Sequence, residues 1–578
     1  MKEKSTMDRS KMTLKKILIL LAVGLAATFC AAGERKLSSE LNAKMTNLLA
    51  GYERQDPSEM VNVIIQFRKA TPLSTHIQRT LAMGGEHRNS LGVIHGSLFR
   101  IPASLIPVLA QDPEIVYISP DRKVIKASPE DRILDNTGTS SVSYYGYYGR
   151  GVGVAVIDSG IRSDHPDFMG SSGHSRVVYS ESFISGLNAS DQFGHGTHAA
   201  GLIAGNGQST QGWMLGIAPK ANLINLRVLD GNGSGTDSAV IAAIQRAIQL
   251  KSQYNIRIIN LSLGRRVSES YTLDPVCQAV EQAWKAGIVV VVAAGNYGRD
   301  NSQGTSGYGT IAVPGNDPYV ITVGALNTHG SSYPQDDTLA SYSSKGPTLI
   351  DHVVKPDIIA PGNSIVSLVA SGSKLDVNYP ATHLPPSEYG SYSSTSVLMR
   401  LSGTSMAAPI VSGSVALMLE RIPSLTPDQV KIRLMTQAAK FYPAYTAAIS
   451  NNGSSYNLQD DIFAVGSGYL DTWSAFASND VPNGTSLSPR AVRDSTGTVR
   501  LQTDPSSAWT DSGYRSNVWG NLLGTGSALW GSSIVWGDCT NAGFSIVWSD
   551  SIVWGDSIVW GDSTNITGFS EAVSSDQY

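Results

Sequence analysis

The chain has 578 residues, more than one hydrophobic core usually holds, so we expect several domains. Charged residues make up only 16% of it, and a formal net charge of -4 offers no basic field to a polyanion, which argues against a nucleic-acid partner. Three cysteines are too few for a framework of disulfides to be the main source of stability.

The first 32 residues are typical of a secretory signal peptide. Lysines between positions 11 and 16 precede an uncharged run, ILILLAVGLAATFCAAG, with the small residues Ala31 and Ala32 near its end as the expected cleavage site. An uncleaved membrane anchor is the alternative, because the run is only slightly shorter than the roughly 20 residues of a bilayer span. We expect a secreted or cell-surface protein with no stable membrane insertion once residues 1–32 are removed.

Two segments of different character follow. Between residues 61 and 126, short apolar strands such as VNVIIQF alternate with a helical stretch rich in Leu and Ile, which predicts a small α+β domain with its core at about residues 60–128. The whole of this domain would span residues 33–128. Residues 129–147 are polar and have the composition of an exposed linker.

From residue 148 to about residue 475, strands alternate with helices. Near-continuous apolar runs such as VGVAVID and IVVVVAA are typical of strands covered on both faces, and SAVIAAIQRAIQL and PVCQAVEQAWKAG have helical spacing. This alternation predicts an α/β domain built on a mainly parallel sheet. In such folds the functional groups gather beyond the carboxyl ends of the strands.

The remaining residues, 476–578, carry a repeat rich in tryptophan. The hexad SIVWGD and its relatives SIVWSD, SALWGS and SNVWGN begin at Ser516, Ser527, Ser533, Ser545, Ser551 and Ser557. One hexad cannot bury its own apolar face, so several would have to stack as strands in hairpin or solenoid rungs. The alternative is a low-complexity tail that stays disordered until it meets a partner.

Three residues at separate element ends carry candidate chemistry. Asp158 ends the buried strand VAVID and needs a partner for its charge, His195 opens the helix HGTHAAG, and Ser405 opens the helix of SGTSMAAP, where free N–H groups favour negative charge. A lone serine there would usually be a helix cap. Together, a serine, an imidazole and a carboxylate suffice for nucleophilic acyl transfer.

The order Asp158, His195, Ser405, each within its extended motif, closely resembles the subtilisin-like serine proteases, the subtilase or S8 family. The resemblance covers about residues 60–475. It implies a three-layer α/β fold and a secreted, monomeric serine endopeptidase that acts on proteins or peptides. It also implies that residues 33–128 are an inhibitor-type propeptide, which assists folding, covers the cleft and is removed by the enzyme itself within the following linker.

The resemblance also assigns a binding site. In VVAAGN it gives Asn296, with the N–H of Ser405, to an oxyanion hole. A peptide would add as a strand beside NLSLGRR, so that Ser262, Leu263 and Gly264 line one side of its pocket and Gly295 the other. Ala312 would form a small pocket floor, which predicts broad specificity with a preference for large apolar residues before the cut.

Some positions depart from the family pattern. Arg265 stands where subtilisins commonly have a second glycine, and it could narrow the cleft or attract acidic residues. His198, one helical turn after His195, could suggest a metal ligand, but a zinc motif would need glutamate where Gly196 stands, so we expect a packing role and no catalytic metal.

A long insertion, which includes VNYPATHLPPSEYGSYSS, predicts a surface loop near the cleft. The segment AGNGQSTQGWMLGIAP does not reproduce the usual calcium loop clearly, so structural calcium is possible but no cofactor is needed for the chemistry.

Two other functions compete with the protease interpretation. A surface-binding or matrix protein would use the protease fold as a scaffold and the repeat tail for attachment. An esterase would use the same three residues without cutting unfolded proteins. Four intact catalytic positions and a peptide-binding strand favour the endopeptidase.

Overall fold

The protein is described here by a computed structural model that covers residues 57–120, 134–519 and 566–568, with short gaps at residues 59, 69, 92–94, 303, 392–394, 441–444, 451–452 and 494–498. Its chain divides into two compact units, Met1–Lys126 and Ala127–Tyr578. The predicted signal peptide and the SIVWGD hexads lie outside the described residues.

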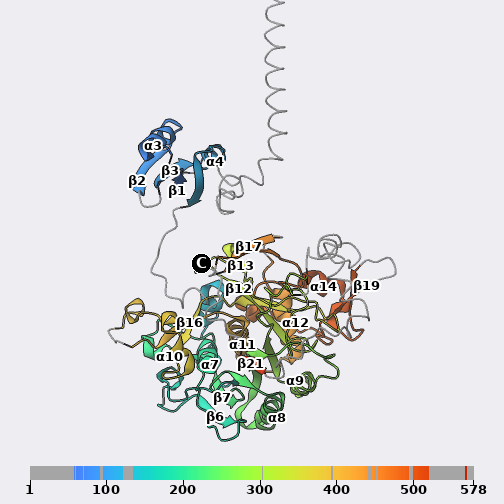
Figure 1. The fold of residues 1–578 in the computed structure, drawn as a ribbon. Helices are drawn as coiled ribbons and strands as arrows, with labels where there is room; N and C mark the ends of the chain where they lie inside the picture. Colours follow the sequence, from blue (N-terminus) through green and yellow to red (C-terminus); the bar gives the residue numbers. More distant parts are fainter. Residues whose placement is uncertain are drawn as a thin grey trace, which may run out of the picture. The chain divides into compact units, whose positions relative to one another are not determined.

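The first unit is a small α+β fold (Figure 1). Its four strands form an antiparallel sheet in the order β2-β3-β1-β4, with bounds β1 (Met60–Phe67), β2 (Glu86–Leu91), β3 (Gly96–Pro102) and β4 (Ile115–Pro120). Alternate residues of β1 are buried, among them Val63 and Ile65, because one face of the sheet packs on helices α3 (Leu73–Ala82) and α4 (Ile106–Ala110). This is the architecture that its hydrophobic pattern predicts.

An eight-stranded sheet forms the centre of the second unit. Its order is β13-β12-β11-β9-β5-β7-β6, with β14 also paired to β12, and every pairing except that of β13 is parallel. The strands are β5 (Gly153–Asp158), β6 (Val177–Ser182), β7 (Asn222–Arg227), β9 (Ile256–Leu261), β11 (Val289–Ala293), β12 (Ile321–Asn327), β13 (Thr338–Leu339) and β14 (Ile358–Pro361). Strands β5 and β11 are buried along their whole length, which explains their continuous apolar sequences and confirms the mainly parallel α/β prediction.

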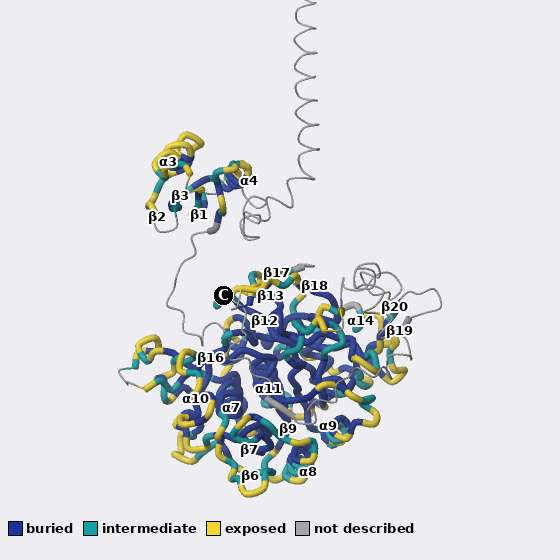
Figure 2. Tube along the Cα trace, in the orientation of Figure 1, coloured by how far each residue is buried: buried dark blue, intermediate teal, exposed yellow. Residues whose placement is uncertain are grey.

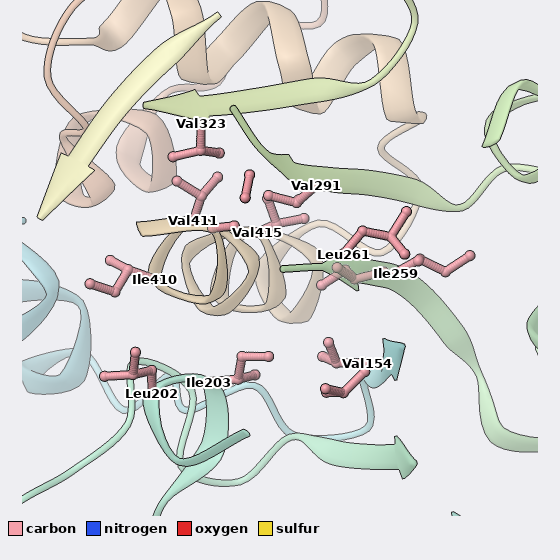
Figure 3. Packing of buried hydrophobic residues seen from close by; sticks show 14 of the residues in the cluster. Val154, Leu202, Ile203, Ile259, Leu261, Val291, Val323, Ile410, Val411 and Val415 are labelled. Atoms are coloured by element: carbon pink, nitrogen blue, oxygen red, sulfur yellow. The ribbon is translucent and has the colours of Figure 1, made fainter. Parts of the chain in front are cut away.

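Helices cover this sheet, and one of them lies in the middle of the core. They are α7 (His195–Ala204), α8 (Asp237–Tyr254), α9 (Pro275–Lys285), α11 (Thr404–Arg421), α12 (Pro427–Gln437) and α13 (Thr472–Ala477). Helix α11 is buried from Thr404 to Leu419, as its dark colour in Figure 2 indicates. Figure 3 shows its residues Ile410, Val411 and Val415 among side chains of α7 and of the central strands. Among the described residues, no helix is both long and apolar enough to cross a bilayer.

Shorter elements surround this core. Three hairpins join β15 (Ile365–Leu368) to β16 (Leu398–Leu401), β17 (Tyr445–Ile449) to β18 (Ser455–Gln459), and β19 (Arg490–Arg493) to β20 (Val499–Gln502). A separate three-stranded sheet has the order β10-β21-β8, from β8 (Ser234–Gly235), β10 (Leu263–Gly264) and β21 (Ile566–Gly568). The predicted insertion contains α10 (Lys374–Asn378) and packs on the turn before α7, where the N–H groups of Lys374 and Leu375 donate to the carbonyls of Gln192 and Phe193.

The predicted exposed linker, residues 129–147, is folded from residue 134 onward. Helix α6 (Thr139–Tyr144) lies within it, and Leu134, Thr137 and Val142 are buried. The helix packs on α13, and Thr472 N–H donates to the carbonyl of Thr137. Polar composition alone misassigned this stretch, because its few apolar side chains find a partner far along the chain.

The start of the region expected to be a repeat tail also packs on the second unit. Trp509 and Trp519 are buried, with ring centroids 5.6 Å apart, in a cluster that includes Ile432 and Met435 of α12. The hexad relative SNVWGN begins at Ser516, and its first four residues belong to helix α14 (Ser512–Trp519) rather than to the predicted strand. For this copy the apolar surface of α12 supplies the burial that a stack of strands was expected to give.

Candidate active site

Asp158 and His195 form a buried hydrogen bond at the carboxyl end of β5. Asp158 Oδ1 lies 2.8 Å from His195 Nδ1, and both side chains are at most 1% exposed. A carboxylate can only accept, so Nδ1 carries the hydrogen, and a neutral imidazole would leave Nε2 as its acceptor nitrogen. Asp158 Oδ1 also accepts from the N–H of Ser159 at 2.7 Å. The pairing supplies the partner that the sequence requires for a carboxylate at this strand end.

A second buried carboxylate, Asp191, holds the turn from which His195 projects. Asp191 Oδ1 accepts from Gly194 N–H at 2.7 Å and from the Ser159 hydroxyl at 2.8 Å, and Oδ2 accepts from Thr197 N–H at 2.8 Å. Burial raises the pKa of Asp191, and these hydrogen bonds oppose that rise. Sequence reasoning missed this residue, because Asp191 lies three residues before the N-cap position Gly194 and has no helix-capping signature of its own.

The glycines on either side of His195 allow close packing. A Cβ at Gly194 would lie 2.5 Å from Ser373 Oγ, and its φ of +107° is a conformation that other residues rarely adopt. A Cβ at Gly196 would lie 2.2 Å from the carbonyl oxygen of Gly160. Both positions therefore require glycine, as the motif FGHG indicates.

Ser405 lies in the first turn of α11 and is fully buried. Its hydroxyl donates to the carbonyl of Ser262 at 2.9 Å, while the Ser262 hydroxyl donates to the carbonyl of Ser405 at the same distance. Helices α7 and α11 pack against each other, so the two elements that begin at His195 and Thr404 are neighbours. The N–H groups of a first helical turn have no partner within the helix and favour negative charge.

Asn296 is oriented by the residue next to Ser405. Its Oδ1 accepts from both the N–H and the hydroxyl of Thr404, each at 3.0 Å. A backbone N–H can only donate, so this contact fixes which end of the amide is the oxygen and directs Nδ2 elsewhere. Within the described part of the chain, Nδ2 of Asn296 is buried without a hydrogen-bond partner. Buried donors are seldom left unsatisfied, so this group calls for an explanation.

Thr404 connects the start of α11 to the loop after β11. Its hydroxyl accepts from Gly295 N–H at 3.1 Å and donates to Asn296 Oδ1, so one side chain fixes two neighbouring residues of the loop after β11. Sequence reasoning missed Thr404, because a threonine before the nucleophile position has the same signature as an ordinary residue at a helix start.

The residues expected to contact substrate come together in two groups. Ser262 contacts Ser405, and Leu263 and Gly264 form β10, which pairs with β21. Gly295 has a φ of +108°, and a Cβ there would lie 3.1 Å from Ala312 Cβ, so these two predicted pocket residues are in contact range. Ala312 N–H donates to the carbonyl of Ala294 at 2.9 Å, which attaches the segment before Pro314 to the end of β11.

Arg265, whose effect on the cleft the sequence leaves open, is held by carboxylates of the fold. Arg265 is 7% exposed, and its guanidinium binds Asp237 Oδ2 at 2.9 Å and Asp274 Oδ2 at 2.7 Å. Burial alone would lower the pKa of Arg265, but the hydrogen bonds and charges of the two carboxylates raise it. Asp274, which is buried, and Asp237, which is partly exposed, neutralise the cation and direct it to the starts of α8 and α9.

His198 has a structural environment. It is fully buried, and its Nε2 lies 3.2 Å from the carbonyl oxygen of Met399. Burial, together with the nearby His195, lowers the pKa of His198 to about 3, so the ring stays neutral.

The residues available do not fit a calcium ion at the predicted loop. Across the described ranges, no group of three or more His, Cys, Asp or Glu side chains is arranged to hold a metal ion. The loop after α7 contains no carboxylate, and calcium prefers carboxylate oxygens. The positive charge near this loop is the guanidinium of Arg176, whose Nη2 donates to the carbonyls of Asp167 and Ala204 at 2.7 and 2.6 Å.

Comparison with known proteins gives this fold and site a family. Residues 149–468 match the model of the Subtilase family, Peptidase_S8. Serine protease AprX of Bacillus subtilis (strain 168) is 39% identical over 343 residues, which are 57% of this chain and 71% of that protein. Subtilisin DY of Bacillus licheniformis is 37% identical over 51% of this chain and 87% of its own, and the Extracellular serine proteinase of Thermus sp. (strain Rt41A) is 32% identical over 63% and 77%.

These matches agree with the Asp, His and Ser motifs and with the mainly parallel sheet. The protein is a serine endopeptidase. The chain belongs to the subtilase family. The family match begins at residue 149, after the first unit.

Proposed function

We propose that Asp158, His195 and Ser405 form a catalytic triad that cleaves peptide bonds through an acyl-enzyme. The Ser405 hydroxyl turns from the Ser262 carbonyl to His195, gives its proton to Nε2 and attacks the scissile carbonyl carbon. His195 then passes that proton to the leaving amine as the C–N bond breaks. A water molecule, deprotonated by the same nitrogen, attacks the ester, and the carboxylate product leaves as the proton returns to Ser405.

The observation that carries this proposal is the 2.8 Å hydrogen bond between the buried Asp158 carboxylate and His195 Nδ1. It fixes the tautomer in which Nε2 accepts a proton, and it places a negative charge where the imidazolium forms. A carboxylate at that position stabilises the protonated ring without taking its proton.

We further assign the oxyanion hole to the Nδ2 group of Asn296 and the backbone N–H of Ser405. The support is the buried Nδ2 donor, which meets no acceptor among the described residues, next to a helix N-terminus. A tetrahedral oxyanion would supply the missing acceptor, and donors held in advance act most strongly on charge that appears only in the transition state. Every step uses groups of the chain and water.

Substrate binding in this proposal uses β10 as a partner for an extended peptide. Main-chain pairing to Leu263 and Gly264 would be largely indifferent to sequence, which gives broad specificity. The pocket between Gly295 and Ser262, with Ala312 at its floor, would accept a large apolar side chain before the cut. The assignment of Ala312 is supported by its contact range to Gly295.

The surrounding segments give this enzyme a maturation pathway. We propose that residues 1–32 direct secretion, that residues 33–128 act as a propeptide, inhibitor and folding aid, and that the mature endopeptidase is a monomer. Because residues from Leu134 onward pack in the second unit, the self-processing cut would fall before them, between residues 121 and 133. Structural calcium outside the loop after α7 is a separate proposal, which chelation tests.

The decisive experiment compares three purified full-length proteins: wild type, Ser405→Ala and Ser414→Ala. Ser414 lies in the same helix, and its hydroxyl contacts Ile410 and Thr472 rather than site residues, so it is a matched control. Casein digestion and the mass of the chain itself are followed. We expect wild type and Ser414→Ala to digest casein and release the first unit, while Ser405→Ala does neither. Equal behaviour of wild type and Ser405→Ala would overturn the proposed mechanism.

A further inference from the structure

A segment near the end of the chain lies between two strands of the second unit. Strand β21 pairs antiparallel with β10 on one edge and with β8 on the other. Leu263 is opposite Gly568 and Gly264 is opposite Thr567, while Ser234 is also opposite Thr567. Residues 520–565 separate β21 from the last residue of α14, so this contact joins distant parts of the sequence. Figure 1 labels β21 within the second unit.

The position of β21 coincides with the proposed substrate groove. Strand β10 consists of Leu263 and Gly264, the residues to which a peptide would pair. Strand β8 forms a second wall, and Gly235 within it has no room for a side chain, because a Cβ would lie 2.3 Å from the carbonyl oxygen of Val228. A strand between two such walls can use its N–H and C=O groups on both edges. The groove is thus built to hold a peptide strand, and β21 fills it.

The register runs β21 from Gly264 towards Leu263, the end of β10 that is next to Ser262. Moving along β10 from Gly264 to Leu263 leads to Ser262, whose carbonyl accepts the Ser405 hydroxyl. Moving along the tail in step leads from Thr567 to Gly568 and then, in sequence, to Phe569. Phe569 lies outside the described residues; as a large apolar residue, it has the chemistry that the proposed pocket prefers.

We propose that the occupant of the groove between β8 and β10 is the chain's own C-terminal segment, which binds as a substrate-like strand and competes with other peptides. This inference rests on the proposed substrate site. Covalent attachment gives the tail an effective concentration on the order of 1 mM, so a strand of about 0.1 mM affinity would occupy the groove for roughly nine-tenths of the time. An outside peptide would then bind with an apparent Kd about tenfold weaker than its intrinsic value.

The test uses Ser405→Ala protein that is folded as the full chain and carries an inserted site for an unrelated specific protease between residues 121 and 133. That protease removes the proposed inhibitory first unit before the measurement, and neither the tail nor the probe is cut by the proposed nucleophile. The probe is a fluorescent tetrapeptide with phenylalanine at its carboxyl end, and its Kd is measured by anisotropy. Thr567→Pro removes an N–H from the middle of the central strand, where proline is not tolerated. Thr567→Val is the matched control, because valine keeps the N–H and favours strands.

We expect Thr567→Pro to bind the probe about tenfold more tightly than its parent, and Thr567→Val to bind it like the parent. A second variant that lacks residues 564–578 should match Thr567→Pro and guards against a fold defect caused by proline. Equal, measurable Kd values for all proteins would overturn the inference and leave the substrate site intact. If none binds the probe, although wild type with Ser405 digests casein, the assignment of the groove itself is wrong.

Discussion

Two buried polar clusters of the second unit use their hydrogen-bonding groups in opposite ways. In the first, Lys431 Nζ donates to the carbonyls of Pro318 and Val320 at 2.8 and 2.9 Å and to Ser488 Oγ at 2.9 Å, and it lies 3.2 Å from Asp357 Oδ1. Burial lowers the pKa of Lys431 to about 7, against the attraction of Asp357. Every hydrogen of this ammonium has an acceptor in the fold.

The second cluster, formed by Asn296 and Thr404, has a hydrogen-bond donor left over. Asn296 Oδ1 is used twice by Thr404, whereas its Nδ2 donor is buried with no acceptor among the described residues. A saturated cluster can stabilise the fold but has nothing left to offer a ligand, while a spare buried donor costs stability unless something binds it. The contrast indicates that one buried cluster serves stability and the other serves the proposed chemistry. Three substitutions test this division.

Lys431→Met should give the largest effect, and on stability alone. Removing the ammonium leaves Asp357 with one cation, Lys355, and leaves several carbonyl oxygens without a hydrogen-bond donor. We therefore expect the free energy of unfolding to fall by roughly 3–5 kcal/mol. Urea unfolding is measured in a Ser405→Ala background to prevent autolysis. Lys285→Met is the control, since its partner Glu281 is a surface neighbour on the same helix and such pairs contribute about 1 kcal/mol or less. A loss no greater than that of the control would remove the distinction between the clusters.

Asn296→Ala should act in the opposite way, on turnover. We expect kcat to fall by about 10² to 10³, a range measured in subtilisin, which belongs to the same family, while KM changes little. The reason is that, in the proposed mechanism, the spare donor meets its acceptor only in the transition state. Steady-state kinetics on a peptide substrate measure this, with Asn225→Ala as the control, because the Asn225 amide already donates to the carbonyl of Ala189 at 2.9 Å. A rise in KM at unchanged kcat would assign Asn296 to ground-state binding instead.

His198→Gln should have the smallest effect, which should appear only in the pH dependence of stability. The pKa of His198 is lowered to about 3 in the fold, against 6.5 as its ordinary value, so the unfolded chain binds more protons between these values. The stability from this group is complete above pH 6.5 and is lost as pH falls, by about 2 kcal/mol between pH 7 and pH 5.

Urea unfolding at both pH values, in the Ser405→Ala background, should therefore show a smaller acid loss for His198→Gln than for its parent. Gln can still donate to the carbonyl of Met399, and the same exchange at exposed His174 is the control. An unchanged acid loss in His198→Gln would mean that the ring is solvated or charged in the fold.

Local sequence patterns predicted the elements that present the proposed site. The end of β5 at Asp158 follows from the apolar run that stops there, and the starts of α7 at His195 and of α11 near Ser405 follow Gly194 and Gly403. These signals are local because a strand end or a helix start is determined by a few neighbouring residues.

Features that depend on distant partners could not be predicted in this way. The role of Arg265 stayed open because its partners Asp237 and Asp274 belong to two different helix starts. Helix α6 looked like a linker because its burial depends on α13. The repeat that contains Trp519 was left between stacked strands and a disordered tail because the surface of α12 was unknown. The roles of Thr404 and β21 likewise appear only when the fold brings remote segments together.

The burial of α11 has a consequence for the lifetime of the enzyme in use. The proposed nucleophile lies in the first turn of the helix that fills the centre of the core, so a chain whose core has opened can neither cut nor resist being cut. In a concentrated solution, folded molecules would cleave each molecule that has unfolded, and this loss of enzyme is irreversible. Shelf life should therefore follow the rate at which α11 leaves the core rather than the equilibrium between folded and unfolded chains. Substitutions that slow that departure would prolong activity even where they leave the melting equilibrium unchanged.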